Sequence, residues 1–149
     1  MSDNDSVDRV GEALRLEFVE DFQDRIIVME RCLQTVGEGE QARGEALNEF
    51  RRELHNIKGT GGAFGFPSLS LICHRFEECL LHLPLIMFGT SRIVLLYLNE
   101  LKKIANAEID PSDKECGEIL RSLPLIGEFP YDEETPKAPR LEAVVVASS

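Results

Sequence analysis

The sequence predicts an all-α protein, an antiparallel four-helix bundle with a short extra helix toward the C-terminal end. Apolar residues recur every three or four positions in several long segments, which is the periodicity of a helix with one buried face. The turns between these segments are short and contain glycine or proline, and short turns join neighbouring helices in antiparallel order. Strand patterns are otherwise absent; only the terminal EAVVVASS is compatible with a short extended piece.

The first two predicted helices lie on either side of Gly37. The first is capped by Asp5, Ser6 or Asp8 and ends at Gly37, and the second begins near Glu40. The apolar stripe of the first helix consists of Val10, Leu14, Phe18, Phe22, Ile26, Met29, Leu33 and Val36. The stripe of the second consists of Leu47, Phe50, Leu54, Ile57 and Phe64.

The third predicted helix follows a turn marked by Gly65 and Pro67, because proline fits the first turn of a helix. Its inward residues are expected to be Leu69, Ile72, Phe76, Leu80 and Leu83. Pro84 and Gly89 then interrupt the pattern. The segment LPLIMFG around them is either a packed loop or an exposed apolar patch, and we favour the packed loop.

Two further helices are predicted before the chain turns irregular. Thr90 or Ser91 caps the fourth helix, and Asp110-Pro111 starts a short fifth helix that ends near Leu120. The inward residues of the fourth helix are expected to be Val94, Leu98, Leu101 and either Ile104 or Ala105.

A length of 149 residues suits a single domain. We expect a flexible N-terminus over residues 1–7, the four-helix bundle over residues 8–122, and an irregular, acidic, proline-containing tail over residues 123–149. No internal repeat divides the chain.

Charge and cysteine content restrict the partners and the compartment. The net charge of −11, without a basic stripe, argues against nucleic acid and anionic membranes as main partners. No apolar run reaches the ~18 residues of a membrane span, and the polar start is unlike a signal peptide. The four cysteines form no CxxC motif, so we expect reduced thiols in a cytoplasmic protein.

The stretch LHNIKGTGGAFGF, residues 54–66, carries four glycines at the end of a helical pattern, although each glycine in a helix interior costs about 1 kcal/mol. It matches neither phosphate-binding glycine loop. Phe64 stands where a dinucleotide fingerprint needs its third glycine, and Lys58 precedes the glycines rather than following them. A helix ended by glycine explains Gly65 well and the earlier glycines poorly.

His55 marks a candidate site beside these glycines. It follows the core position Leu54, and one residue turns about 100° around a helix, so His55 should flank the core and meet solvent. The same side of the helix carries Arg51, Lys58, Gly59 and Gly62. Small residues there would let the backbone of a partner protein come close, so we assign the two glycines and Arg51 to partner docking.

Folding the chain back at Gly65 brings a second set of polar residues to the level of His55. Positions about ten residues after the turn include His74 and Glu77, which share one face of the third helix. A carboxylate such as Glu77 that accepts from one ring nitrogen fixes the tautomer and raises the basicity of the other. The ammonium of Lys58 would favour an incoming phosphoryl group.

These residues carry a resemblance to a known family. The pattern His55-x-x-Lys58-Gly59, followed by Thr60 and Gly65, resembles the histidine-containing phosphotransfer (HPt) family. The stretches FRRELHNIKGTGGAFGF and LICHRFEECL look most like the phosphotransfer (P1) domain of the chemotaxis kinase CheA. The motif covers about residues 50–80, and the helical layout extends the resemblance to about residue 120.

The resemblance implies a four-helix bundle that carries phosphate and binds no ATP. His55 would accept a phosphoryl group on Nε2 from a histidine kinase or a receiver domain and pass it to the aspartate of a response regulator. Lys58, His74 and Glu77 would form a hydrogen-bonded group with it. The resemblance also implies a monomer without a cofactor of its own, because the partner would supply Mg²⁺. The sequence departs mildly from the family at Asn56 and Ile57.

The kinase, regulatory and coupling regions of CheA find no counterpart in the sequence, which suits either a stand-alone carrier or an excised domain. One alternative is an HPt-like module that is not phosphorylated and inhibits a kinase or receiver by binding it. Another is a metal site formed by Cys73, His74, Cys79 and His82, which their spacing on one helix disfavours. A self-contained enzyme ranks lower still, because the sequence shows no nucleotide motif and no catalytic triad.

Overall fold

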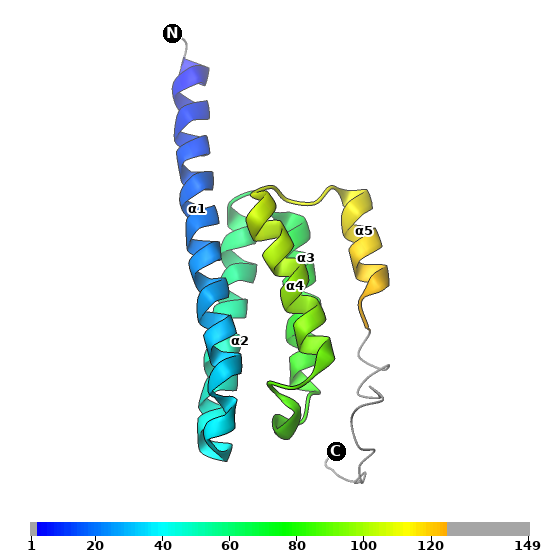
Figure 1. The fold of residues 1–149 in the computed structure, drawn as a ribbon. Coiled ribbons are helices and arrows are strands. Elements are labelled where there is room, and N and C mark those ends of the chain that lie inside the picture. Colours follow the sequence, from blue (N-terminus) through cyan, green and yellow to red (C-terminus); the bar gives the residue numbers. More distant parts are fainter. Residues whose placement is uncertain (1–2, 125–149) are drawn as a thin grey trace.

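The computed structural model of the protein describes residues 3–124, and all secondary structure within that range is helical (Figure 1). The prediction of an all-α fold is confirmed. The elements, in chain order, are α1 (Asp3–Gln34), η1 (Thr35–Glu38), α2 (Glu40–Ala63), α3 (Pro67–Leu81), η2 (Leu85–Met87), α4 (Arg92–Ala107) and α5 (Asp113–Ser122).

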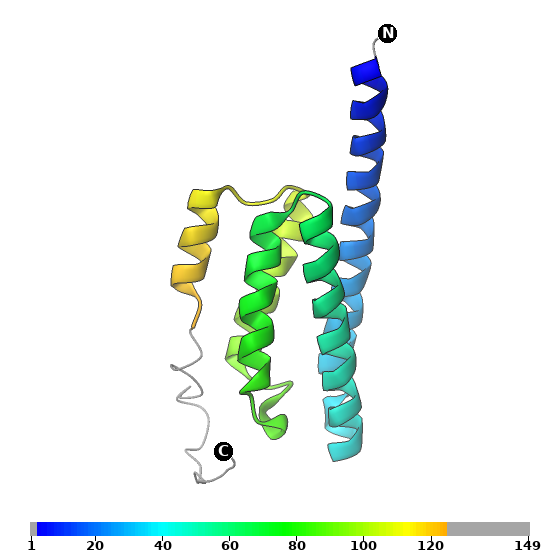
Figure 2. The same cartoon turned by 180° about the vertical axis from the view of Figure 1, so that it is seen from behind.

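Helices α1 to α4 pack side by side as a bundle, and α5 lies against α3 (Figures 1 and 2). Successive helices run in opposite directions because their connections are short. Among the described residues, no helix is long and apolar enough to cross a membrane. The most extensive helix contact is between α2 and α3, so these two helices provide a closely packed base for side chains that project from them.

Aromatic residues from α2, α3, α4 and the loop after η2 pack together in the core. The ring of Phe50 on α2 meets Phe76 of α3 edge-on at 5.6 Å and Phe88 at 5.3 Å, and Phe76 stacks on Tyr97 of α4 at 4.9 Å. Phe88 is buried, and so is Leu83. The LPLIMFG segment is therefore a packed loop, as favoured from the sequence.

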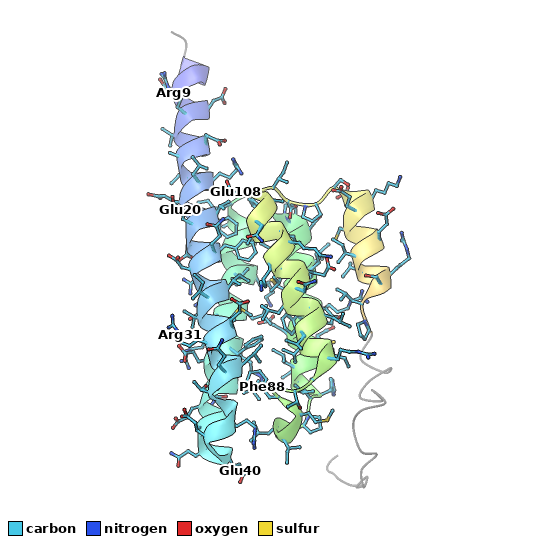
Figure 3. All side chains as sticks on the ribbon, viewed as in Figure 1. Arg9, Glu20, Arg31, Glu40, Phe88 and Glu108 are labelled. Atoms are coloured by element: carbon cyan, nitrogen blue, oxygen red, sulfur yellow. The ribbon has the colours of Figure 1, made fainter. Side chains whose placement is uncertain are left out.

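The first helix is longer than predicted at its N-terminal end. It begins at Asp3, so residues 3–7, which we expected to be flexible, are helical, and the predicted caps lie inside the helix. Val10 and Leu14 are exposed rather than buried, because α1 projects beyond the other helices of the bundle. Figure 3 shows Arg9 well beyond the level of Glu108 at the end of α4.

The ends of the first two helices also differ from the prediction. A 3-10 turn follows α1, and the chain reverses at Gly39, whose φ of +117° favours glycine, rather than at Gly37. Phe64 lies past the last residue of α2 and is exposed, whereas Phe66 is buried in its place. The turn between α2 and α3 passes through Gly65 at φ +87°. The predicted apolar stripe of α2 therefore holds only as far as Ile57.

Serine residues cap the N-terminal ends of α4 and α5. Ser91, and not Thr90, caps α4, and its Oγ accepts from the backbone N–H groups of Ile93 and Val94. Ser112 caps α5 and forms a capping box with Glu115. The prediction that Asp110-Pro111 starts α5 is therefore wrong by a few residues.

Asp110 instead caps a helix that is distant in sequence. Its two carboxylate oxygens accept from the backbone N–H groups of Ser68 at 3.0 Å and Leu69 at 2.9 Å. These groups belong to the first turn of α3, where a carboxylate satisfies otherwise unpaired donors and the positive end of the helix dipole. Asp110 thus holds the loop before α5 against the helix that carries Glu77.

The described chain ends in contact with the bundle. Leu123 is buried, and the hydroxyl of Tyr97 donates to the carbonyl of Pro124 at 2.8 Å. Leu123 thus belongs to the core, although the sequence suggested that the tail begins there. Most of the predicted tail, including EAVVVASS, lies outside the described residues.

Candidate functional site

His55 stands on the outward side of α2, beside the core. Leu54 and Ile57, its neighbours in the helix, are fully buried, whereas 69% of the His55 side chain is exposed. A step of one residue turns the helix by about 100° and separates the imidazole from the core stripe. The histidine is therefore fixed on a rigid helix and reachable by a large partner.

Glu77 reaches His55 from α3. Its Oε2 lies 3.1 Å from Nδ1 of His55, while only 22% of the Glu77 side chain is exposed. An ionised carboxylate can only accept a hydrogen bond, so a neutral imidazole in this contact has its proton on Nδ1. The lone pair on Nε2 is then left for chemistry.

Lys58 completes a three-membered group. Its Nζ lies 2.6 Å from Oε1 of Glu77, so the two oxygens of one carboxylate serve a histidine and a lysine that are three residues apart on α2. The lysine is itself mostly covered, with 26% of its side chain exposed. With the proton on Nδ1, this arrangement leaves Nε2 free on the same side of α2 as a fixed ammonium group.

A comparison with protein-family models identifies the family of the chain. The family model described as the Hpt domain matches residues 13–106. The chain belongs to the Hpt domain family. Hpt domains act in histidine phosphotransfer in two-component signalling, where they interact with histidine kinases and response regulator receivers. No solved structure matches the chain.

His74 of this Hpt domain does not join the group around Glu77. Its Nε2 lies 3.4 Å from Oε2 of Glu78, four residues later on the same helix. Both oxygens of Glu77 are already engaged by His55 and Lys58, and Glu78 lies one turn away on the His74 side. The four residues that we expected to form one hydrogen-bonded group thus divide into a triad and a separate pair.

Arg51 lies near the site but is held by the end of α3. Its Nη2 donates to the backbone carbonyl of Leu80 at 3.0 Å, in the last turn of that helix. This carbonyl also accepts from the backbone N–H of Leu83, and a cation at this position opposes the negative end of the helix dipole. This contact gives Arg51 a stabilising role that sequence spacing did not predict.

The glycines of α2 differ from one another in what surrounds them. A side chain at Gly59 would meet no atom within 4 Å, and one at Gly62 would meet only Oγ of Ser70 at 3.6 Å. Gly61 is buried, and a side chain there would lie 3.4 Å from Leu69 and 3.6 Å from the carbonyl of Phe66. Gly61 therefore lies in the packed contact of α2 with α3, where an added side-chain carbon would just touch its neighbours, whereas internal packing gives no reason for glycine at position 59.

Ser70 is a supporting residue that sequence reasoning missed. Its hydroxyl donates to the backbone carbonyl of Lys58 at 3.0 Å and links α3 to α2 about one turn C-terminal to His55. The bond ties α3 to α2 near the residues that contact Glu77. Serine near the start of a helix is too common for the sequence alone to reveal this role.

The cysteines and histidines of α3 do not converge. Cys73 and Cys79 are buried as free thiols, whereas His74 is 59% exposed and faces Glu78. Burial raises the pKa of the Cys73 thiol well above its ordinary value. Within residues 3–124, no group of three or more His, Cys, Asp or Glu side chains is placed to hold a metal ion.

Proposed function

We propose that this Hpt domain is a phosphoryl carrier in which Nε2 of His55 is the acceptor atom. The observation that carries the proposal is the pairing of an exposed imidazole with Glu77 at Nδ1, which leaves Nε2 outside that contact. The histidine accepts the phosphoryl group from a histidine kinase or a phosphorylated receiver and donates it to the aspartate of a response regulator.

The transfer step is a displacement at phosphorus. The Nε2 lone pair forms the nitrogen–phosphorus bond while the bond from phosphorus to the donor oxygen breaks, and the donor keeps that electron pair. The ring gains positive charge as it attacks, and the carboxylate of Glu77 stabilises that charge through the Nδ1–H bond. Lys58 attracts the phosphoryl oxygens and offsets their repulsion by Glu77.

The partner is proposed to supply what this domain lacks. A receiver or kinase would bring Mg²⁺ and most of the catalysis, so the carrier needs a reachable histidine rather than a closed pocket. Gly59 supports this division, because its surroundings are open and a partner backbone can approach there. The four buried free thiols fit the cytoplasmic location in which two-component partners meet.

Mass spectrometry after incubation with ATP and a panel of histidine kinases, or with phosphorylated receivers, tests the proposal. We expect one acid-labile phosphoryl group on the wild-type protein and none on His55→Gln. The matched control, His74→Gln, should be labelled like the wild type. A label that persists in His55→Gln would refute the assignment, and binding of a kinase without any label would identify an inhibitory module instead.

A further inference from the structure

The N-terminal part of α1 stands clear of the bundle (Figures 1 and 3). Nη1 of Arg15 donates to the backbone carbonyl of Glu108 at 2.8 Å, which marks the level at which α1 leaves the other helices. The twelve or so residues before it project by about 18 Å at 1.5 Å per residue.

One face of this projection is apolar. Val7, Val10 and Leu14 are exposed by 67%, 60% and 43%, and their spacing of three and four residues aligns them along the helix. Small residues flank them, and a side chain added at Gly11 would meet nothing within 4 Å. The charged side chains of this part lie around the opposite side: Asp8, Arg9 and Glu12. We call Val7, Val10 and Leu14 the α1 stripe.

The α1 stripe lies beyond the C-terminal end of α2. Leu14 is one turn before Phe18, whose ring stacks on the exposed Phe64 at a centroid distance of 6.0 Å. Phe64 directly follows the last residue of α2. The side of α1 that packs on α2 within the bundle therefore continues toward the N-terminus as an uncovered apolar face. Phe64 lies at the end of this face that is nearest the bundle.

We propose that the α1 stripe binds the α1 stripe of a second copy of this chain, in an antiparallel pair with two-fold symmetry. The proposal concerns the projecting part of α1 and does not depend on phosphotransfer at His55. It differs from the monomer expected from the family resemblance.

A second copy would cover the exposed apolar face from Val7 to Phe64 with an apolar helix face of the same length. In an antiparallel pair the tip of each helix reaches the base of the other, so Val7 of one copy lies beside the partner's Leu14 while Val10 and Gly11 lie near the two-fold axis. The partner's helix then continues the line of α2 and places its N-terminus over the C-terminus of α2. Helix dipoles are favourably aligned in that arrangement.

The surface is small, so we expect the two copies to associate weakly. Three apolar side chains per copy, with Phe64 at each end, form an interface below the roughly 1,200 Å² of a standard complex. Pairing should therefore depend on protein concentration. Gly11 and Ala13, which flank the stripe, allow the two backbones to approach closely and improve the packing.

Sedimentation of the full chain between about 10 and 500 µM tests the pairing. We expect the mean mass of the wild type to rise toward that of a dimer, and the double variant V10E/L14E to show at least tenfold weaker association. The matched control Ile27→Glu changes an apolar residue on the same helix with 52% exposure, and it should associate like the wild type. Unchanged thermal unfolding would show that each variant is folded.

A wild type that stays monomeric at the highest concentration would overturn the proposal. If V10E/L14E then also slowed labelling of His55, the stripe would belong to a kinase or receiver interface instead. A dimer that persists in V10E/L14E would place the contact elsewhere.

Cysteine cross-linking tests the antiparallel order. Gly11→Cys should form a disulfide-linked dimer under mild oxidation, because the two copies of position 11 meet near the axis. In the same pair two Ser6→Cys thiols lie about 14 Å apart along the axis, and a disulfide needs Cα atoms within about 7 Å. Cross-linking of Ser6→Cys but not of Gly11→Cys would overturn the antiparallel arrangement.

Discussion

His55 and His74 are both exposed histidines with a glutamate beside them, yet their surroundings differ in kind. His55 contacts a carboxylate on another helix that is mostly covered and is shared with Lys58. His74 contacts Glu78 on its own helix, and both side chains are largely in solvent. An i,i+4 pair in solvent contributes a few tenths of a kcal/mol and fixes little, whereas the contact between helices orients the ring. The difference teaches that a carboxylate prepares a histidine for chemistry when a second helix holds it in place.

The largest expected effect that sharpens this comparison comes from removing each glutamate in turn. Glu77→Ala should slow phosphorylation of His55 by about tenfold. This is the lower end of the roughly 10–100-fold loss that follows removal of a carboxylate orienting a metal-bound histidine. Glu78→Ala should leave the rate nearly unchanged. Initial rates of label incorporation measure both variants, and equal rates would show that the contact between helices has no special role.

Removal of the lysine should have a smaller effect. Lys58→Ala removes one ammonium group near the incoming phosphoryl oxygens, and a charge interaction worth about 1 kcal/mol corresponds to roughly a fivefold slower reaction. The loss should shrink as salt concentration rises, because salt screens the attraction in the wild type. Rates measured in low and high salt check this, and a salt-independent loss would point to misplacement of Glu77 instead.

The smallest of the three effects on phosphotransfer is expected from a substitution at Gly59. Gly59→Leu should not lower the temperature of thermal unfolding, because its surroundings are open and leucine favours a helix, but should slow transfer to a receiver by a few-fold through steric hindrance. Gly44→Leu on the same helix is the matched control, since a side chain there also meets nothing within 4 Å. Equal transfer rates in the two variants would argue against docking at Gly59.

The helix content and the core were predictable because apolar spacing is a local property. The stripes of α3 and α4 were predicted correctly, since residues such as Ile72 and Leu98 lie on helices packed along their whole length. The prediction was wrong where a helix outruns its neighbours, as at Val10, or ends before its apolar pattern does, as at Phe64. Sequence periodicity does not reveal where the neighbouring helices stop.

The candidate site was predictable in its helix positions but not in its pairing. Counting from the turn at Gly65 correctly placed Glu77 opposite His55, because two antiparallel helices share a height. Which of two adjacent glutamates each histidine meets depends on side-chain rotamers and on competition with Lys58. The burial of Gly61 became visible only with α3 in place, because the atom nearest to its added side-chain carbon belongs to Leu69 of that helix.

The cap that Asp110 provides for α3 has a consequence for the order of folding. The first turn of α3 lies more than forty positions before the carboxylate that completes it. During synthesis, domains form from the N-terminal end as the chain emerges. Helices α1, α2 and α3 can therefore associate early. The N-terminal end of α3 acquires its cap, Asp110, only after all of α4 has been made. The helix that presents Glu77 is thus fully secured in a late event, when the chain has turned past α4.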